Sequence, residues 1–176
     1  VHERPLVLDG EDLGLIAVSV DGTALDEGSY TYVGGKLTVN TVPDDFIFGA
    51  VINIQPETNT SLEGLYRSRT MYCTQCEAEG YRKITFGLDR PDVLATYTVT
   101  LSADKASCPV LLSNGNEVSR ADLSDGRHQV VWHDPHPKPS YLFAIVAGDL
   151  ELVSDTFTTQ SGKVVDLRIW VEEKDT

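Results

Sequence analysis

The sequence predicts an all-β fold of packed antiparallel sheets, similar to a β-sandwich. Three observations point to it: apolar and polar residues alternate with a period of two, glycine turns separate the alternating segments, and the segments are short. About ten such strands would form two packed sheets. We expect one domain over residues 1–176, because a chain of 176 residues with 41% hydrophobic content can bury one sizeable core.

Four segments in the first third of the chain have the strand pattern: Leu15–Val20, Tyr30–Val33, Lys36–Val39 and Phe46–Ile54. The first ends at Asp21-Gly22, and Gly34-Gly35 joins the second to the third. Both dipeptides suit hairpin turns, which need residues with positive φ. The polar segment 56–60 closes the fourth strand.

The second half repeats the pattern at Leu94–Leu101, His128–Trp132, Tyr141–Ala147 and Val165–Val171. Turns are predicted at Asn114-Gly115, Asp125-Gly126 and Ser161-Gly162. Because Tyr141–Ala147 is almost continuously apolar, it should be a central strand buried on both faces and ending at Gly148.

Two segments depart from the strand pattern. Residues 133–139 carry a proline at every second position from 135, so we expect a rigid loop that cannot donate a regular hydrogen-bond ladder. Near Glu77–Gly80 a single helical turn is predicted, since Thr74 could cap it and Glu77 stands three residues on, as in a capping box.

The charge and the cysteines narrow the class of partner and the compartment. Twenty-seven acids against fourteen bases give a net charge of -13, which repels phosphate backbones and anionic bilayers, so neither nucleic acid nor membrane is expected as a partner. No apolar run approaches the roughly 20 residues of a membrane span, and we expect a soluble chain. Three cysteines, an odd number, favour a reducing compartment and therefore the cytoplasm.

The C-x-x-C pair of Cys73 and Cys76 raises two alternatives to a pair of reduced, partly buried thiols. His133 and His136 could complete a Cys₂His₂ zinc site, although their spacing is far from that of a zinc finger. A redox pair would need a helix N-terminus within a βαβ unit, which an all-β chain lacks. Cys108, next to Pro109, has no adjacent base and is a poor nucleophile.

Gln75 and Glu77 are the candidate binding residues. In extended backbone their side chains would point to the same side and could together bind a small cationic group: the carboxylate would supply charge and the amide a hydrogen bond. A primary ammonium fits this pair of groups. Gln75 and Glu77 could also be solvated surface residues or helix-capping residues. The sequence contains no H-E-x-x-H, G-x-S-x-G or phosphate-binding loop, so we predict no catalytic residue in this chain.

The segment QCEAEGYRKIT at residues 75–85, followed by DRPDV at 89–93, resembles the amino-terminal domain of the bacterial aminopeptidase N family, zinc-dependent gluzincin exopeptidases. The family commonly has phenylalanine where this chain has Tyr81. The similarity extends from about Thr58 to Glu172, whereas the first fifty or so residues match only in strand character. Further collinear matches lie at Leu112–Asn116, Asp134–Pro139, Tyr141–Asp149 and Asp155–Thr159.

The resemblance implies that the chain is a fragment, the saddle-shaped β domain of an enzyme whose catalytic domain is absent here. The catalytic domain would hold the zinc, so this chain would have no metal site and no cofactor of its own. Gln75 and Glu77 match the loop that this domain contributes to the active-site cleft. Glu77 would pair with the free α-ammonium of a peptide substrate, and Gln75 would bind near its first side chain.

The sequence is also compatible with two other functions. The chain could be a stand-alone β-sandwich module that binds carbohydrate or protein, which would favour an exposed aromatic platform. It could also be a purely structural domain, which would leave Gln75 and Glu77 without a ligand. The fragment hypothesis instead predicts an apolar face for docking on the catalytic domain.

Overall fold

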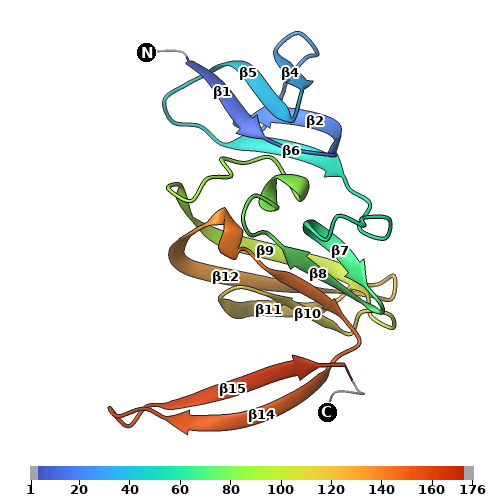
Figure 1. Cartoon of the computed structure of the whole chain (residues 1–176), viewed down its shortest axis with the longest axis vertical. Helices are drawn as coiled ribbons and strands as arrows, with labels where there is room; N and C mark the ends of the chain where they lie inside the picture. The colour runs from blue at the N-terminus through green and yellow to red at the C-terminus, as the bar shows by residue number, and fades with distance from the viewer. Residues whose placement is uncertain (1–3, 173–176) are drawn as a thin grey trace.

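The computed structural model describes residues 4–172, which are built from β-strands and two single-turn 3₁₀ helices (Figure 1). Every strand pairing between these elements is antiparallel, which confirms the all-β prediction. Within this range no helix has the length and apolar character needed to cross a membrane. In chain order the elements are β1 (Arg4–Asp9), β2 (Gly14–Val20), β3 (Thr23–Ala24), β4 (Tyr30–Val33), β5 (Lys36–Val42), β6 (Phe48–Asn53), β7 (Gly64–Ser68), β8 (Met71–Gln75), η1 (Tyr81–Lys83), β9 (Leu94–Asp104), β10 (Val110–Ser113), β11 (Asn116–Asp122), β12 (Arg127–Pro139), η2 (Ser140–Leu142), β13 (Ile145–Gly148), β14 (Glu151–Thr158) and β15 (Val164–Val171).

The amino-terminal layer consists of two small sheets, with strand orders β1-β5-β4 and β3-β2-β6. It lies at the blue end of the molecule in Figure 1. Burying each aliphatic or aromatic side chain between the sheets contributes about 1.5–3 kcal/mol relative to leaving it exposed. One core residue, Phe86, comes from the segment after η1, so this later segment is also anchored in the layer. The buried core residues are Leu8, Leu13, Val18, Leu37, Val39, Val42 and Phe86.

The middle layer contains the sheets β10-β13-β8-β7 and β11-β12-β9. Cys108, Leu111 and Val130 form its buried core. Trp132 packs against this core, and its indole Nε1 donates a hydrogen bond of 3.0 Å to the carbonyl oxygen of Leu111. Because Trp132 lies in β12 and Leu111 in β10, this bond links the two sheets.

The strands β14 and β15 pair only with each other and form a separate hairpin at the red end of Figure 1. All eight residues of β14 are exposed. The predicted alternation of Val165–Val171 and the turn at Gly162, where φ is +83°, are both present. None of the apolar residues of this alternation is buried: Leu167 and Ile169 are exposed, and Val165 and Val171 are half-buried. Period-two patterning here therefore does not mark burial within the chain.

The predicted glycine turns are present at each of the remaining positions. Gly22, Gly34, Gly35, Gly115 and Gly126 all adopt positive φ. Gly22, Gly34-Gly35 and Gly126 each join two paired antiparallel strands, whereas Gly115 connects β10 to β11, which lie in different sheets. The predicted strands of the first third correspond to β2, β4, β5 and β6. Local turn chemistry therefore predicted these hairpins well.

The prediction that residues 133–139 form a loop is wrong. β12 continues to Pro139 and pairs with β9 through Asp134 opposite Tyr97 and Lys138 opposite Ala95. The register shifts between Asp134 and Lys138, so the prolines at 135 and 137 fall in the irregular stretch, where their missing N–H groups interrupt no ladder. Lys138 Nζ lies 2.7 Å from Asp134 Oδ2 and closes this bulge.

Two further predictions need correction. Residues 140–142 form η2, so the central strand predicted from Tyr141 begins only at Ile145, and its residues 145–147 are half-buried. This strand, β13, does lie between β10 and β8. The helical turn predicted at Glu77–Gly80 is also absent: residues 77–80 form a turn, and the 3₁₀ helix η1 begins only at Tyr81. Thr74 lies in β8, where its Oγ1 accepts a hydrogen bond of 3.0 Å from the Ile145 amide instead of capping a helix.

Two glycine turns that flank β11 give a matched test of the packing. Gly115 and Gly126 have φ of +86° and +81°, but an added Cβ would lie 2.1 Å from the His133 carbonyl oxygen at Gly115 and would meet nothing at Gly126. We predict that Gly126→Ala lowers the free energy of unfolding by about 1 kcal/mol, because alanine is strained in the left-handed region. Gly115→Ala should lower the free energy of unfolding by roughly 2–4 kcal/mol, since the backbone at His133 must also move. Urea unfolding followed by circular dichroism measures the free energy of unfolding of both variants. An equal loss of stability in the two would contradict the predicted clash.

Candidate functional site

The candidate residues Gln75 and Glu77 lie at the end of β8 and in the turn that follows it. Gln75 is the last residue of β8 and pairs with Gly64 of β7. The strand ends there, so Glu77 belongs to the turn of residues 77–80 and not to extended backbone. Both residues are exposed, whereas Cys76 between them is buried at 3% exposure. The buried cysteine anchors the start of the turn at the end of β8.

The structure brings Gln75 and Glu77 together through one direct contact. The Gln75 amide Nε2 donates a hydrogen bond of 3.1 Å to the Glu77 carbonyl oxygen. A second bond, from the Gly80 amide to the Cys76 carbonyl oxygen at 2.9 Å, closes the turn. Within residues 4–172 the carboxylate of Glu77 has no hydrogen bond or ion pair. The turn therefore presents an unpaired negative charge at the surface, beside a side-chain amide that is held in place.

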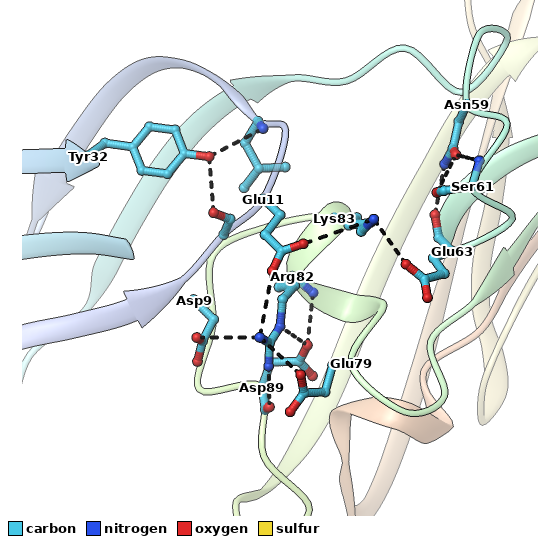
Figure 2. A network of polar contacts seen from close by, with 12 residues as sticks. Asp9, Glu11, Tyr32, Asn59, Ser61, Glu63, Glu79, Arg82, Lys83 and Asp89 are labelled. Atoms are coloured by element: carbon cyan, nitrogen blue, oxygen red, sulfur yellow. Dashed lines mark hydrogen bonds and ion pairs between the residues drawn. The ribbon is translucent and has the colours of Figure 1, made fainter. Parts of the chain in front are cut away.

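Two residues after Glu77, a second acid is already paired. Glu79 Oε2 lies 3.2 Å from Nη1 of Arg82, the central residue of the network in Figure 2. The Arg82 guanidinium also donates to Asp89, through Nε to Oδ2 at 3.0 Å and Nη2 to the carbonyl oxygen at 3.1 Å. Although burial opposes its charge, the bond to Asp89 and the nearby carboxylates of Asp9 and Glu79 raise the pKa of Arg82. Arg82 thus remains charged at any physiological pH.

A second cation extends the network toward the amino-terminal layer. Lys83 Nζ lies 3.0 Å from Glu63 and 4.0 Å from Glu11 (Figure 2). The hydrogen bond to Glu63 raises the pKa of Lys83 against the opposing effect of burial. Neither Arg82 nor Lys83 was identified as a candidate from the sequence. Their roles depend on partners up to about 70 residues away in the chain, such as Glu11 and Asp9, which no local pattern reveals.

The cysteines and histidines do not form the alternative zinc site. No group of three or more His, Cys, Asp or Glu side chains that could hold a metal ion occurs in the described part of the chain. All three cysteines are free thiols, with Cys73 half-buried and Cys76 and Cys108 buried. His133 Nδ1 instead makes a hydrogen bond of 2.9 Å with Thr98 Oγ1. The C-x-x-C spacing is therefore part of a strand and its exit, not a ligand set.

His128 has a structural contact. It is 1% exposed, and its Nε2 lies 2.7 Å from the Cys108 carbonyl oxygen. Because a carbonyl only accepts, Nε2 is the protonated ring nitrogen. This hydrogen bond ties the start of β12 to the segment before β10.

The family model of the Peptidase M1 N-terminal domain matches residues 4–142 of the chain. Aminopeptidase N of Caulobacter vibrioides is 50% identical over 169 residues, which cover 96% of this chain and 20% of that protein. Aminopeptidase N of Escherichia coli is 50% identical over 173 residues, covering 97% of this chain and 19% of that protein. The chain thus spans about a fifth of the length of these relatives.

Solved structures share the fold. The crystal structure of Legionella pneumophila aminopeptidase A in complex with aspartic acid superposes with a TM-score of 0.95 at 36% identity, over 100% of this chain and 21% of that one. An M1 zinc metallopeptidase from Deinococcus radiodurans superposes with a TM-score of 0.79 at 18% identity, over 98% of this chain and 41% of that one. At this lower identity the second similarity concerns the fold alone.

Burial controls the reactivity of the thiols, and this can be measured. Burial raises the pKa of Cys76 to about 12, with a further contribution from the charge of Asp89, and burial also raises the pKa of Cys108. At pH 8 only about one Cys76 in ten thousand is then a thiolate, the reactive form. We predict that iodoacetamide at pH 8 modifies Cys73 first and reaches Cys76 and Cys108 only in denaturant. Mass spectrometry of the alkylated peptides checks this, and equally fast native labelling of Cys76 would contradict it.

Proposed function

The chain belongs to the family of peptidase M1 N-terminal domains, and on that premise we propose that it is the amino-terminal domain of a zinc aminopeptidase. Such an enzyme hydrolyses the first peptide bond and releases an N-terminal amino acid. Support comes from the relatives named Aminopeptidase N, which are 50% identical to almost the whole chain. Residues 1–176 would form one β domain, and the catalytic residues would lie in the remaining four fifths of the protein.

The observation that carries the site proposal is the unpaired carboxylate of Glu77, which lies beside the held amide of Gln75. We assign Glu77 to the free α-ammonium of a peptide substrate and Gln75 to a hydrogen bond near the first residue. An ammonium has three N–H donors and a full charge, so it satisfies a carboxylate well. An internal peptide bond brings no charge, and it would leave the carboxylate desolvated and unpaired at a cost of about 1–3 kcal/mol or more.

This assignment explains why the enzyme would act as an exopeptidase. If the ammonium is held at Glu77, only the first peptide bond lies at the fixed distance where the reaction takes place. The aspartic acid bound to the Legionella aminopeptidase has the free α-amino group that this proposal requires of a ligand.

The zinc of the proposed enzyme would be bound outside this chain. The side chains described here provide no group of ligands that fits a zinc ion, which needs about four thiolate, imidazole or carboxylate ligands. In the proposed reaction zinc would activate a water molecule. The contribution of this chain would be to bind and orient the substrate.

The β14–β15 hairpin suits docking on the metallopeptidase domain that follows in the proposed full-length protein. Leu152, Asp166 and Trp170 line a groove of about 800 Å³ between the hairpin and β11–β12. The alternate residues therefore lie on the opposite face, because successive side chains of a strand alternate. Four apolar residues on that face, which also carries Asp155, are exposed by 43–60%: Val153, Phe157, Leu167 and Ile169. Only one of the four is aromatic, which favours a docking face over the aromatic platform of a stand-alone binding module.

The proposed protein would work in the cytoplasm and bind neither nucleic acid nor membrane. Three free cysteines, two of them buried, are consistent with a reducing compartment. The net charge of -13 would repel polyanions and anionic lipid.

Substitution of Glu77 tests the proposed role directly. In the full-length enzyme, Glu77→Gln and Glu77→Ala should raise KM and lower kcat/KM roughly tenfold to hundredfold, because a charged hydrogen bond is worth about 1.5–3 kcal/mol. Hydrolysis of aminoacyl p-nitroanilides measures both constants. Glu79→Gln is the matched control: it removes a neighbouring exposed acid that is paired with Arg82, and it should change KM by less than about twofold. Unchanged KM and kcat/KM in both Glu77 variants would contradict the assignment.

The docking face predicts how the isolated chain behaves in solution. An exposed apolar face of this kind should drive self-association at high protein concentration. Ile169→Ser should reduce the self-association measured by sedimentation velocity. Ile16→Ser, which removes an isoleucine of similar exposure from β2 (63% against 60%), should not. A monodisperse monomer at millimolar concentration would count against the docking face.

A further inference from the structure

Asp89 holds Arg82 at three points. Its Oδ2 accepts hydrogen bonds from the Arg82 backbone amide at 3.1 Å and from the Arg82 Nε at 3.0 Å. Its carbonyl oxygen accepts a third bond, from Nη2 at 3.1 Å. Both the main chain and the side chain of Arg82 are therefore fixed, in the middle of η1 and two residues after the turn that carries Glu77.

The carboxylate of Asp89 is itself anchored in the middle layer. Asp89 is 1% exposed, and Ser140 Oγ donates a hydrogen bond of 2.5 Å to its Oδ1. Ser140 is buried as well and lies 51 residues further along the chain, in η2. Since both carboxylate oxygens accept hydrogen bonds from different segments, Asp89 has little freedom to move and can serve as a fixed point for the loop.

The position of Arg82 is transmitted to the turn through Gly80. An added Cβ at Gly80 would lie 2.3 Å from the Gln75 carbonyl oxygen and 3.1 Å from the Cys76 Cα, so the main chain at residue 80 packs directly on the main chain that precedes Glu77. The Gly80 amide donates to the Cys76 carbonyl oxygen at 2.9 Å, and the Gly80 carbonyl oxygen accepts from the Lys83 amide at 3.0 Å. A displacement of η1 must therefore displace the turn.

Arg82 also distinguishes between the two acids of the turn. Its Nη1 lies 3.2 Å from Glu79, while no cation of residues 4–172 contacts the carboxylate of Glu77. The same Nη1 lies 3.9 Å from Asp9 and 3.8 Å from Glu11 (Figure 2). Three carboxylates therefore surround Nη1 of Arg82. The guanidinium neutralises Glu79 and does not pair with Glu77.

We propose that Arg82 and Asp89 are positioning residues for substrate binding: the ion pair between the half-buried Arg82 and the buried Asp89 sets the place of the Glu77 turn and keeps the Glu77 carboxylate free for the substrate ammonium. This inference rests on the proposed function of Glu77. It adds that the affinity for the ammonium depends on a pair that does not touch the substrate.

The test is a double-mutant cycle in the full-length enzyme. Arg82→Lys keeps the charge but loses the fork of donors that binds Asp89. In the wild-type background it should raise KM roughly threefold to tenfold and leave kcat within about twofold, because the binding group is displaced and not the reacting centre. In the Glu77→Gln background the same change should alter KM by less than about twofold, because the displaced carboxylate is no longer there.

Two variants make the cycle specific. Arg90→Lys is the matched control, since Arg90 pairs with Asp92 at 2.6 Å in the same segment, but both side chains are exposed and neither is bonded to residues 77–80. It should leave KM unchanged. Ser140→Ala removes one bond to Asp89 and keeps the ion pair, so it is a milder change that serves if Arg82→Lys lowers the yield of folded protein. It should raise KM in the same background-dependent way.

The outcomes separate the two proposals. An equal rise of KM in both backgrounds, or a lower Tm with unchanged KM, would show that Arg82 has a structural role only and would overturn this inference. If Glu77→Gln alone leaves KM unchanged, the proposed function of Glu77 fails, and this inference fails with it. A KM effect of Arg82→Lys that disappears in the Glu77→Gln background supports both.

Discussion

The ion pair between the half-buried Arg82 and the buried Asp89 is the interaction on which the arrangement of the layers depends. A carboxylate that is 1% exposed is tolerated only when it is paired and hydrogen-bonded, and here both oxygens are satisfied. Such a pair contributes little net stability compared with apolar packing. Losing one partner is costly, however, by about 3–5 kcal/mol, because an uncompensated charge is left inside. The pair thus acts as a strong constraint on geometry.

The constraint matters because residues 76–93 run between the two larger layers and contact both. On one side Phe86 lies in the amino-terminal core, and Gly87 exchanges backbone hydrogen bonds of 2.8 and 3.0 Å with Asp9 of β1. On the other side Asp89 binds Ser140 of the middle layer. A binding group placed on such a segment is held by the whole scaffold, as precise recognition of a small ammonium group requires.

The turns and the strand alternation could be predicted because they depend on neighbouring residues. Gly34-Gly35 between two short segments of strand pattern favours a hairpin wherever it occurs. The failures arose where distant contacts override local preference. The prolines of residues 133–139 suggested a loop, yet a register shift against β9 accommodates them. Thr74 suggested a helix cap, yet its hydroxyl is used by β13.

The sequence by itself determined the class of fold, most of the hairpins and the candidate residues Gln75 and Glu77, since each follows from local patterning or from a contiguous motif. Only the tertiary structure decided which acids are already paired. Glu77 and Glu79 are chemically identical and two residues apart, and no local pattern distinguishes them. The folded chain brings Arg82 to Glu79 and leaves Glu77 unpaired among the described residues, because Arg82 is held by a buried aspartate that a serine 51 residues away keeps in place.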